Sequence, residues 1–394
     1  MTHPQSGFYL PLGLLRDAGW SKVTDFDQYL TLIRDYVKKN PEYNGKPTIG
    51  FTTEADSWRI YVLKLAPGHL NGHYNGGGFK VDPNTYETTS YALDDITKNY
   101  MFKLNQLWNE GLCDKEMFSQ NYDQHIAKIA SGRVIGFYDE RWQIQDAINS
   151  LEKQGLFDRI PFAMPVLEKG VTKDPYRGML VAGIGAGVSI SKDAKDPEFV
   201  FKFIDRMCGE DIQKLANWGI EGEDYSVQDG KMVKSEEQIK QFEDTEYTSQ
   251  RGFGTNLMWW LFPHNAPGDM YSDGSGTIFW DQSEQYIKTK YKDYEKEFLK
   301  AYNLNTLNDM FAEPFKSPYG VIYDVQMTDD NPAKVVGDRS YDISNRMLPK
   351  VIMAKPGKFE EAWNEYVAEM NKLDWKTYNA YYTEQIRKRV AEWN

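Results

Sequence analysis

The sequence has few of the residues that build disulfide frameworks and metal centres. Its 394 residues include two cysteines, Cys113 and Cys208, and five histidines. The cysteines lie far apart and form no Cys-x-x-Cys or Cys/His motif, so the pattern favours two free thiols over a disulfide. His69 and His73 are four residues apart, but their glycine- and asparagine-rich surroundings favour a loop over a zinc-binding helix. We therefore expect no metal and no cofactor.

An excess of positive charge and a long apolar run are also missing. The net charge is −12, which argues against a nucleic-acid partner because such proteins carry a basic stripe. No apolar run reaches the roughly 18 residues of a transmembrane helix, and residues 1–7 lack the basic and apolar regions of a signal peptide. With 41% hydrophobic and 26% charged residues, the composition is that of a globular protein.

Aromatic residues are abundant, at 14% of the chain, and residues 121–143 place several of them beside charged groups. This stretch predicts a helix with Tyr122, Ile126 and Ile129 on one face, a turn at Gly132, and a strand over residues 134–137. The residues expected beyond the strand are aromatic or charged: Tyr138, Asp139, Glu140, Arg141 and Trp142.

The end of a strand is where an α/β sheet binds its ligand, outside the carboxyl edge. An aromatic ring among hydrogen-bonding groups suits a sugar, which needs a flat apolar face and polar partners for its hydroxyls. We therefore take Trp142, Arg141, Glu140 and Asp139 as candidate ligand-binding residues. The alternative is that Trp142 belongs to the core of the following helix.

A second strand ends in the same way. Residues 26–37 predict a helix with an apolar face, residues 47–51 predict a strand, and Trp58 and Arg59 follow a polar stretch after that strand. Trp58 and Arg59 are therefore the second pair of candidate ligand-binding residues.

Residues 251–280 contain seven aromatic residues interrupted by Gly, Pro and Asn, which excludes a regular element and favours a functional loop. The candidates in this loop are Trp259, Trp260, Tyr271 and Trp280. Their alternative role is a small aromatic core. Earlier in the chain, a helix beginning at Asp196 and Pro197 is expected to bury Phe199 and Phe203.

Several motifs together resemble the family-1 extracellular solute-binding proteins of ABC importers. The similar stretches are YLPLGLLRDAGW, NPEYNGKPTIGF, YDQHIAKIASGRVIGFYDERW, GVSISKDAKDPE, WGIEGEDY and the closing segment from residue 349. The resemblance covers nearly everything after residue 7, and it is nearest to lipoprotein-type members from Gram-positive soil bacteria.

The resemblance implies an α/β fold of the periplasmic-binding-protein-like type II, with two lobes joined by hinge crossings. Residues 1–178 would form the first part of the second lobe, and residues 179–316 the return segment of the first lobe with its aromatic loop. Residues 317–394 would provide the closing helices and the last hinge crossing, near which Tyr319 is a further candidate. Family members begin with a lipobox signal and a first half-lobe, so the first lobe is expected to be truncated.

The resemblance also implies a function. The protein would capture an oligosaccharide between its lobes and present it to the ABC permease subunits, as an extracellular monomer that is lipid-anchored in its full-length form. Trp142 and Trp58 would face the cleft and stack on the solute.

Enzyme motifs are absent, since there is no G-x-S-x-G, H-E-x-x-H or Walker A sequence. We therefore expect a binding protein. The alternatives are a carbohydrate-active enzyme (a glycoside hydrolase or lyase), whose two carboxylates no motif reveals, and a surface sugar sensor.

Overall fold

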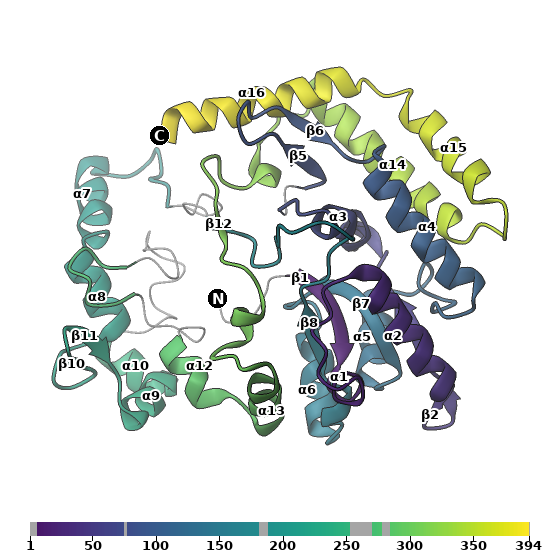
Figure 1. Cartoon of the computed structure of the whole chain (residues 1–394). Coiled ribbons are helices and arrows are strands. Elements are labelled where there is room, and N and C mark those ends of the chain that lie inside the picture. Colours follow the sequence, from purple (N-terminus) through teal and green to yellow (C-terminus); the bar gives the residue numbers. More distant parts are fainter. Residues whose placement is uncertain (1–5, 75–76, 181–187, 253–269, 278–283, 394) are drawn as a thin grey trace. The chain divides into compact units, whose positions relative to one another are not determined.

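The computed structural model describes residues 6–74, 77–180, 188–252, 270–277 and 284–393 (Figure 1). The chain divides into two compact units. The larger unit contains His3–Val181, Phe298–Asn305 and Asp309–Asn394, and the smaller unit contains Ala182–Glu297 and Thr306–Asn308. Among the described helices, none combines the length and the apolar character that crossing a membrane requires.

A buried sheet forms the centre of the larger unit. From one edge to the other, its four strands are β4 (Ile49–Thr52), β7 (Val134–Glu140), β1 (Ser6–Pro11) and β8 (Pro161–Met164). β7 pairs in parallel with β4, whereas β1 runs antiparallel to both β7 and β8. Every residue of β1, β4 and β7 is buried, because other elements cover both faces of the sheet.

Helices and short turns surround this sheet. Their bounds are α1 (Leu12–Asp17), α2 (Phe26–Lys39), η1 (Ser57–Ile60), α3 (Tyr61–Leu70), α4 (Asp95–Asn109), α5 (Tyr122–Ala130), α6 (Gln145–Lys153) and η2 (Phe157–Arg159). The predicted helix over residues 26–37 is confirmed as α2, which begins where the Asp25 carboxylate accepts the backbone N–H of Gln28 at 3.0 Å. α2 packs so closely on β7 that a Cβ at Gly136 would lie 2.3 Å from Ile33 Cδ1.

Aromatic side chains fill the space between the sheet and its helices. Phe8 of β1 is fully buried, and its ring centroid lies 5.1 Å from that of Phe26 and 5.3 Å from that of Tyr29. It also lies 6.4 Å from the Tyr100 ring and 5.0 Å from the Tyr138 ring. Phe8 therefore ties the sheet to α2 and α4 at a single point.

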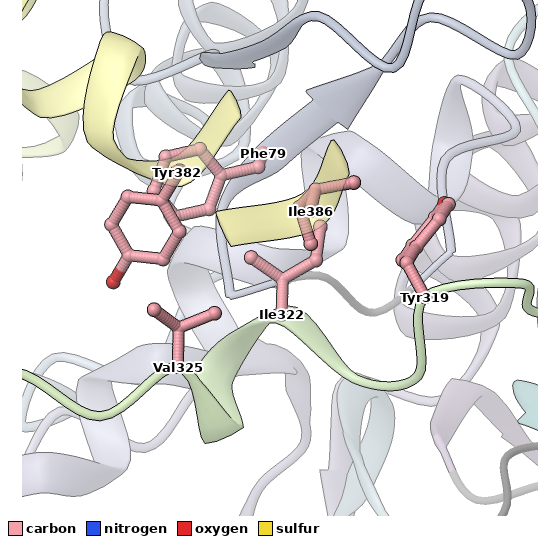
Figure 2. Close-up of a cluster of buried hydrophobic side chains, with 6 residues drawn as sticks. All are labelled: Phe79, Tyr319, Ile322, Val325, Tyr382 and Ile386. Atoms are coloured by element: carbon pink, nitrogen blue, oxygen red, sulfur yellow. The ribbon is translucent and has the colours of Figure 1, made fainter. Parts of the chain in front are cut away.

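The C-terminal helices belong to the larger unit and complete it. They are α14 (Pro332–Ile352), α15 (Phe359–Met370) and α16 (Trp375–Trp393). α16 packs on the hairpin of β5 (Phe79–Val81) and β6 (Thr88–Ser90). Figure 2 shows the apolar cluster between this hairpin, α16 and η4 (Ile322–Asp324), which contains Phe79, Tyr319, Ile322, Val325, Tyr382 and Ile386.

The remaining elements are short or lie in the smaller unit. They are β2 (Glu42–Tyr43), β3 (Lys46–Pro47), β9 (Met179–Leu180), α7 (Pro197–Met207), α8 (Glu210–Trp218), β10 (Ser226–Gln228), β11 (Lys231–Val233), α9 (Glu236–Glu243), α10 (Thr245–Arg251), α12 (Glu284–Lys290), α13 (Asp293–Tyr302), η3 (Leu307–Met310) and β12 (Phe315–Lys316). A cluster of Trp218, Met232, Ile239, Phe242 and Tyr271 forms the core of the smaller unit.

The expected burial of the α7 face is wrong. The helix itself is present, but Phe199 is 66% exposed and Phe203 is 48% exposed, and no residue of α7 is buried. Helical spacing identifies an apolar face, but it does not show that another element covers that face.

Candidate functional site

Two tryptophans from different strand ends stack on each other in the larger unit. The ring centroids of Trp58 and Trp142 lie 6.1 Å apart with an interplanar angle of 12°. Tyr61 stacks on Trp58 at 5.7 Å and 7°. The tryptophans meet because β4 and β7 are parallel neighbours, so the segments that follow them leave the same edge of the sheet. We call Trp58, Tyr61 and Trp142 the aromatic platform.

Both indoles are accessible. Trp58 is 48% exposed and Trp142 is 59% exposed, which is unusual for a side chain with so large an apolar surface. The alternative that Trp142 is a core residue of the next helix is therefore wrong for this structure. Exposed, parallel rings offer a flat apolar surface to a ligand.

The strand before Trp142 is longer than its sequence suggests. We expected it to cover residues 134–137, but β7 continues to Glu140 because β1 pairs with it as far as the register Ser6 to Glu140. Tyr138, Asp139 and Glu140 are consequently buried, at 5% exposure or less. The charged groups thus lie beneath the surface, with Trp142 exposed beyond them.

Asp139 organises the turn that carries Trp142. Its carboxylate accepts hydrogen bonds from Gln143 Nε2 and from the Glu140 backbone N–H, both at 2.7 Å, and lies 3.3 Å from His125 Nε2. His125 comes from α5, whose first turn is fixed by a capping box between Asn121 and Gln124. The turn after β7 is therefore held by a buried polar network.

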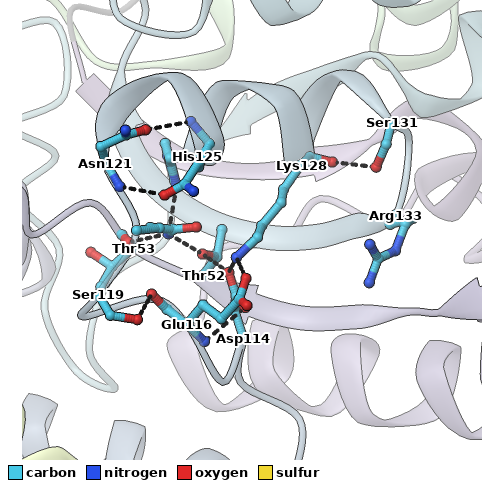
Figure 3. A network of polar contacts seen from close by, with 12 residues as sticks. Thr52, Thr53, Asp114, Glu116, Ser119, Asn121, His125, Lys128, Ser131 and Arg133 are labelled. Carbon is cyan, nitrogen blue, oxygen red and sulfur yellow. Dashed lines mark hydrogen bonds and ion pairs between the residues drawn. The ribbon is translucent and has the colours of Figure 1, made fainter.

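Figure 3 shows the part of this network that lies around α5 and the end of β4. Lys128 Nζ lies 2.8 Å from both Asp114 Oδ2 and Glu116 Oε2. Asp114 is only 6% exposed, and its carboxylate also accepts hydrogen bonds from the Thr52 hydroxyl at 3.3 Å and from the Glu116 backbone N–H at 3.1 Å. These contacts join α5 to the end of β4, and His125 of α5 contacts Asp139 of β7. Both strands that lead to the platform are therefore held by α5.

Arg59 lies between two aromatic rings at the platform. Its guanidinium carbon is 4.0 Å from the Tyr122 ring centroid and 4.8 Å from that of Trp58. The Tyr122 hydroxyl in turn donates to the Gln143 carbonyl at 2.5 Å. Cation–π contact with two rings holds the guanidinium plane in place.

The backbone just before Trp58 is strained and braced. Ser57 has φ +55°, a left-handed conformation that residues other than glycine adopt rarely. Its carbonyl accepts a hydrogen bond from the Tyr341 hydroxyl of α14 at 2.7 Å. Tyr341 therefore positions Trp58 from a distant part of the sequence.

We expect Tyr341→Phe to disturb the tryptophan stack while keeping the fold. The substitution removes one hydrogen bond, worth about 0.5–1.5 kcal/mol, and leaves Ser57 without its brace. The near-UV circular dichroism of the coupled indoles should shrink. Adding Ser57→Asn should restore it, since asparagine adopts the left-handed region more readily. An unchanged spectrum in Tyr341→Phe would show that the brace does not orient Trp58.

Glu140 is a buried carboxyl group that stays mostly protonated at neutral pH. Burial, reinforced by the charge of Asp139, raises its pKa from 4.5 to about 8. Burial likewise raises the pKa of Glu54, whose Oε2 has no hydrogen-bond partner among the described residues. At neutral pH the folded protein thus keeps a proton on Glu140 that the unfolded chain has released.

This proton makes stability depend on pH. The folded pKa of Glu140 is above its unfolded value, so stability declines as pH rises from about 4.5 to about 8. The slope from this one group approaches about 1.4 kcal/mol per pH unit. In urea unfolding between these pH values, Glu140→Gln should therefore show a flatter profile than the wild type. Parallel profiles would contradict the raised pKa.

The other candidate residues are placed differently. Tyr271 is 1% exposed and Tyr319 is 7% exposed, each within an apolar cluster, so neither offers a ring face to a ligand. Trp259, Trp260 and Trp280 lie outside the described residues. Arg141 is half-buried next to Trp142.

Sequence reasoning missed Tyr61 and Tyr341, and it treated Tyr122 only as part of a helix face. Tyr61 could have been predicted from sequence, since it lies three residues after Trp58 and shares its side of a helical turn. No sequence pattern could have predicted the role of Tyr341, because only the tertiary fold brings α14 to Ser57. Tyr323 is 59% exposed, unlike Tyr319, and is among the groups that raise the pKa of Tyr61 in the platform.

Similarity to solved structures is extensive. The chain resembles an extracellular solute-binding protein from Bifidobacterium longum subsp. infantis with a TM-score of 0.63 and 16% identity, over 99% of this chain and 74% of that one. It resembles S. pneumoniae FusA, an ABC-transporter substrate-binding protein in complex with fructo-nystose, with a TM-score of 0.57 and 17% identity, over 99% and 73%. The chain has the fold of the solute-binding proteins of ABC transporters. The predicted α/β fold class is confirmed.

Similarity in sequence is narrower. The chain is 25% identical over 243 residues to Lipoprotein LipO of Bacillus subtilis (strain 168), across 57% of this chain and 45% of that protein. It thus spans less than half the length of this curated relative. No model of a protein family matches the sequence. The resemblance to lipoprotein-type solute-binding proteins that the motifs indicate is confirmed by these similarities.

Proposed function

We propose that the protein is the solute-binding component of an ABC importer and that its aromatic platform binds an oligosaccharide. The observation that carries this proposal is the pair of exposed, parallel indoles at the ends of neighbouring strands. Sugar rings stack on such surfaces through their C–H faces, and the polar groups around the platform serve the hydroxyls. FusA, which shares the fold, binds fructo-nystose in its solved structure.

Capture without catalysis is part of the proposal. A glycosidase offers two carboxyl groups to the bond that it cleaves. Here the Asp139 carboxylate is occupied by Gln143, His125 and a backbone N–H, and Glu140 is 5% exposed. Neither carboxyl group is offered to a ligand on the platform, which supports binding over hydrolysis.

The cellular setting follows from the same proposal. The protein acts at the cell surface as a lipid-anchored monomer in its full-length form and delivers its solute to permease subunits. Residues 1–178 form the first part of the second lobe, residues 179–316 form the return segment of the first lobe, and residues 317–394 provide the closing helices and the last hinge crossing. The division of the chain into two compact units supports this assignment.

One incubation separates binding from catalysis. Oligosaccharides of three to five sugar units are titrated by calorimetry, and each mixture is then kept overnight and examined by mass spectrometry. We expect saturable heat with the oligosaccharide recovered intact. Shortened products that accumulate with time would overturn the proposal in favour of a carbohydrate-active enzyme.

A further inference from the structure

Two arginines beside the tryptophans have nitrogen atoms without partners. Arg59 Nε and Arg141 Nη1 are the buried arginine nitrogens, among the described residues, that have no hydrogen-bond partner. Neither side chain forms an ion pair within the described part of the chain. Other partly buried arginines there have polar partners: Arg34 contacts Glu110 at 2.6 Å, and Arg159 Nη1 donates to the Tyr36 hydroxyl at 2.6 Å. Among the described arginines, a buried nitrogen without a partner thus occurs in the two segments that carry Trp58 and Trp142.

The Arg59 guanidinium is held in a fixed orientation. The Tyr122 and Trp58 rings contact it at 4.0 Å and 4.8 Å, and Tyr122 is anchored to the Gln143 carbonyl. Its Nε is buried without an acceptor, and no other N–H group of this guanidinium has an acceptor among the described residues. A planar fork of donors with no protein acceptor suits an oxyanion, which can accept two parallel hydrogen bonds.

The neighbouring carboxyl groups form no ion pair with Arg59 or Arg141 among the described residues. Asp139 is engaged by His125 and Gln143, and Glu54 Oε1 accepts the Asp56 backbone N–H at 2.6 Å. The pKa of Glu140 is about 8, so this group is mostly uncharged at neutral pH. An oxyanion at the platform would therefore not have to displace a protein carboxylate from either guanidinium group.

We propose that the platform recognises an acidic sugar, with the sugar ring against the tryptophans and its anionic group on Arg59, assisted by Arg141. The anionic group is a uronate carboxylate or a sulfate ester. This inference rests on the proposed function and narrows it to a substrate class. The bidentate pairing of Arg59 with an oxyanion supplies the selectivity over neutral sugars, because a neutral sugar leaves the guanidinium charge unmatched.

The test uses matched pairs of ligands. Oligogalacturonate of three to five units is compared with the same oligomer after reduction of its carboxyl groups, and a sulfated oligosaccharide with its desulfated form. Calorimetry is run at low and high salt, with wild type, Arg59→Gln, and Arg339→Gln as the control. Arg339 is exposed on α14, outside the site.

We expect the acidic member of at least one pair to bind the wild type about tenfold tighter than its neutral partner. Its binding should weaken at high salt. The preference for the acidic member should be lost in Arg59→Gln and kept in Arg339→Gln. The pair that shows the preference identifies carboxylate or sulfate as the anion. Equal binding of acidic and neutral members, or a preference that Arg59→Gln retains, would overturn this inference and leave the proposed function standing. Failure of every oligosaccharide to bind would overturn both.

Discussion

Replacing Trp142 by alanine should weaken oligosaccharide binding by about 30-fold or more, since a tryptophan at the centre of a binding surface contributes about 2 kcal/mol or more. The indole is 59% exposed, so its removal opens no cavity and should leave the free energy of unfolding nearly unchanged. The same direction is expected for Trp58→Ala. The double substitution should reduce the binding free energy by less than the sum of the two single reductions, because the two rings contact each other.

Calorimetric titration and urea unfolding of each variant check this prediction. Phe102→Ala is the matched control, because Phe102 is an exposed aromatic residue of α4 (41% exposed) that packs on Phe359 rather than on the platform. The control should bind as the wild type does. If Trp142→Ala kept full affinity, the indole would have no role in binding and Tyr323 would become the better candidate.

Replacing Phe8 by alanine should lower the free energy of unfolding by about 3–5 kcal/mol, the usual cost of removing a buried phenylalanine. Phe8 is 0% exposed and contacts rings from α2, α4 and β7. Those aromatic neighbours are large and stiff, so they cannot close the cavity that the substitution leaves. A loss of this size approaches the whole stability of an ordinary domain.

Chemical unfolding followed by tryptophan fluorescence measures this loss. Phe157→Ala supplies the control, because Phe157 is 46% exposed and should cost well under 1 kcal/mol at the surface. A loss below about 1 kcal/mol for Phe8→Ala would show that the core repacks around the missing ring and that Phe8 does not tie the sheet to its helices.

Much of the site could be predicted because its signals are local. A strand followed by a polar stretch and a tryptophan occurs twice, and parallel pairing of neighbouring strands brings such ends together. The helix over residues 122–130 follows from its apolar spacing and its capping residues. Trp58, Arg59 and Trp142 were therefore identified from sequence, although their mutual contact was not.

The remainder depends on long-range packing that no local pattern encodes. The end of β7 is set by pairing with β1, which extended the strand through Asp139 and Glu140 and buried both. The brace from Tyr341 depends on where α14 packs. Tyr319 and Tyr323 are four residues apart with the same chemistry, yet Tyr319 lies in an apolar cluster before η4, whereas Tyr323 lies within η4 and is exposed.

The proposed binding site is tested most directly by whether an oligosaccharide shifts the NMR signals of the platform tryptophans. Among the indole N–H signals of the 11 tryptophans, those of Trp58 and Trp142 can be assigned in two-dimensional NMR by phenylalanine substitution. Titration with an oligosaccharide that the protein binds should shift these two signals. The signals of Trp218 and Trp363 should stay unchanged, since both side chains are buried. Saturable binding with the Trp58 and Trp142 signals unmoved would contradict the platform as the binding site.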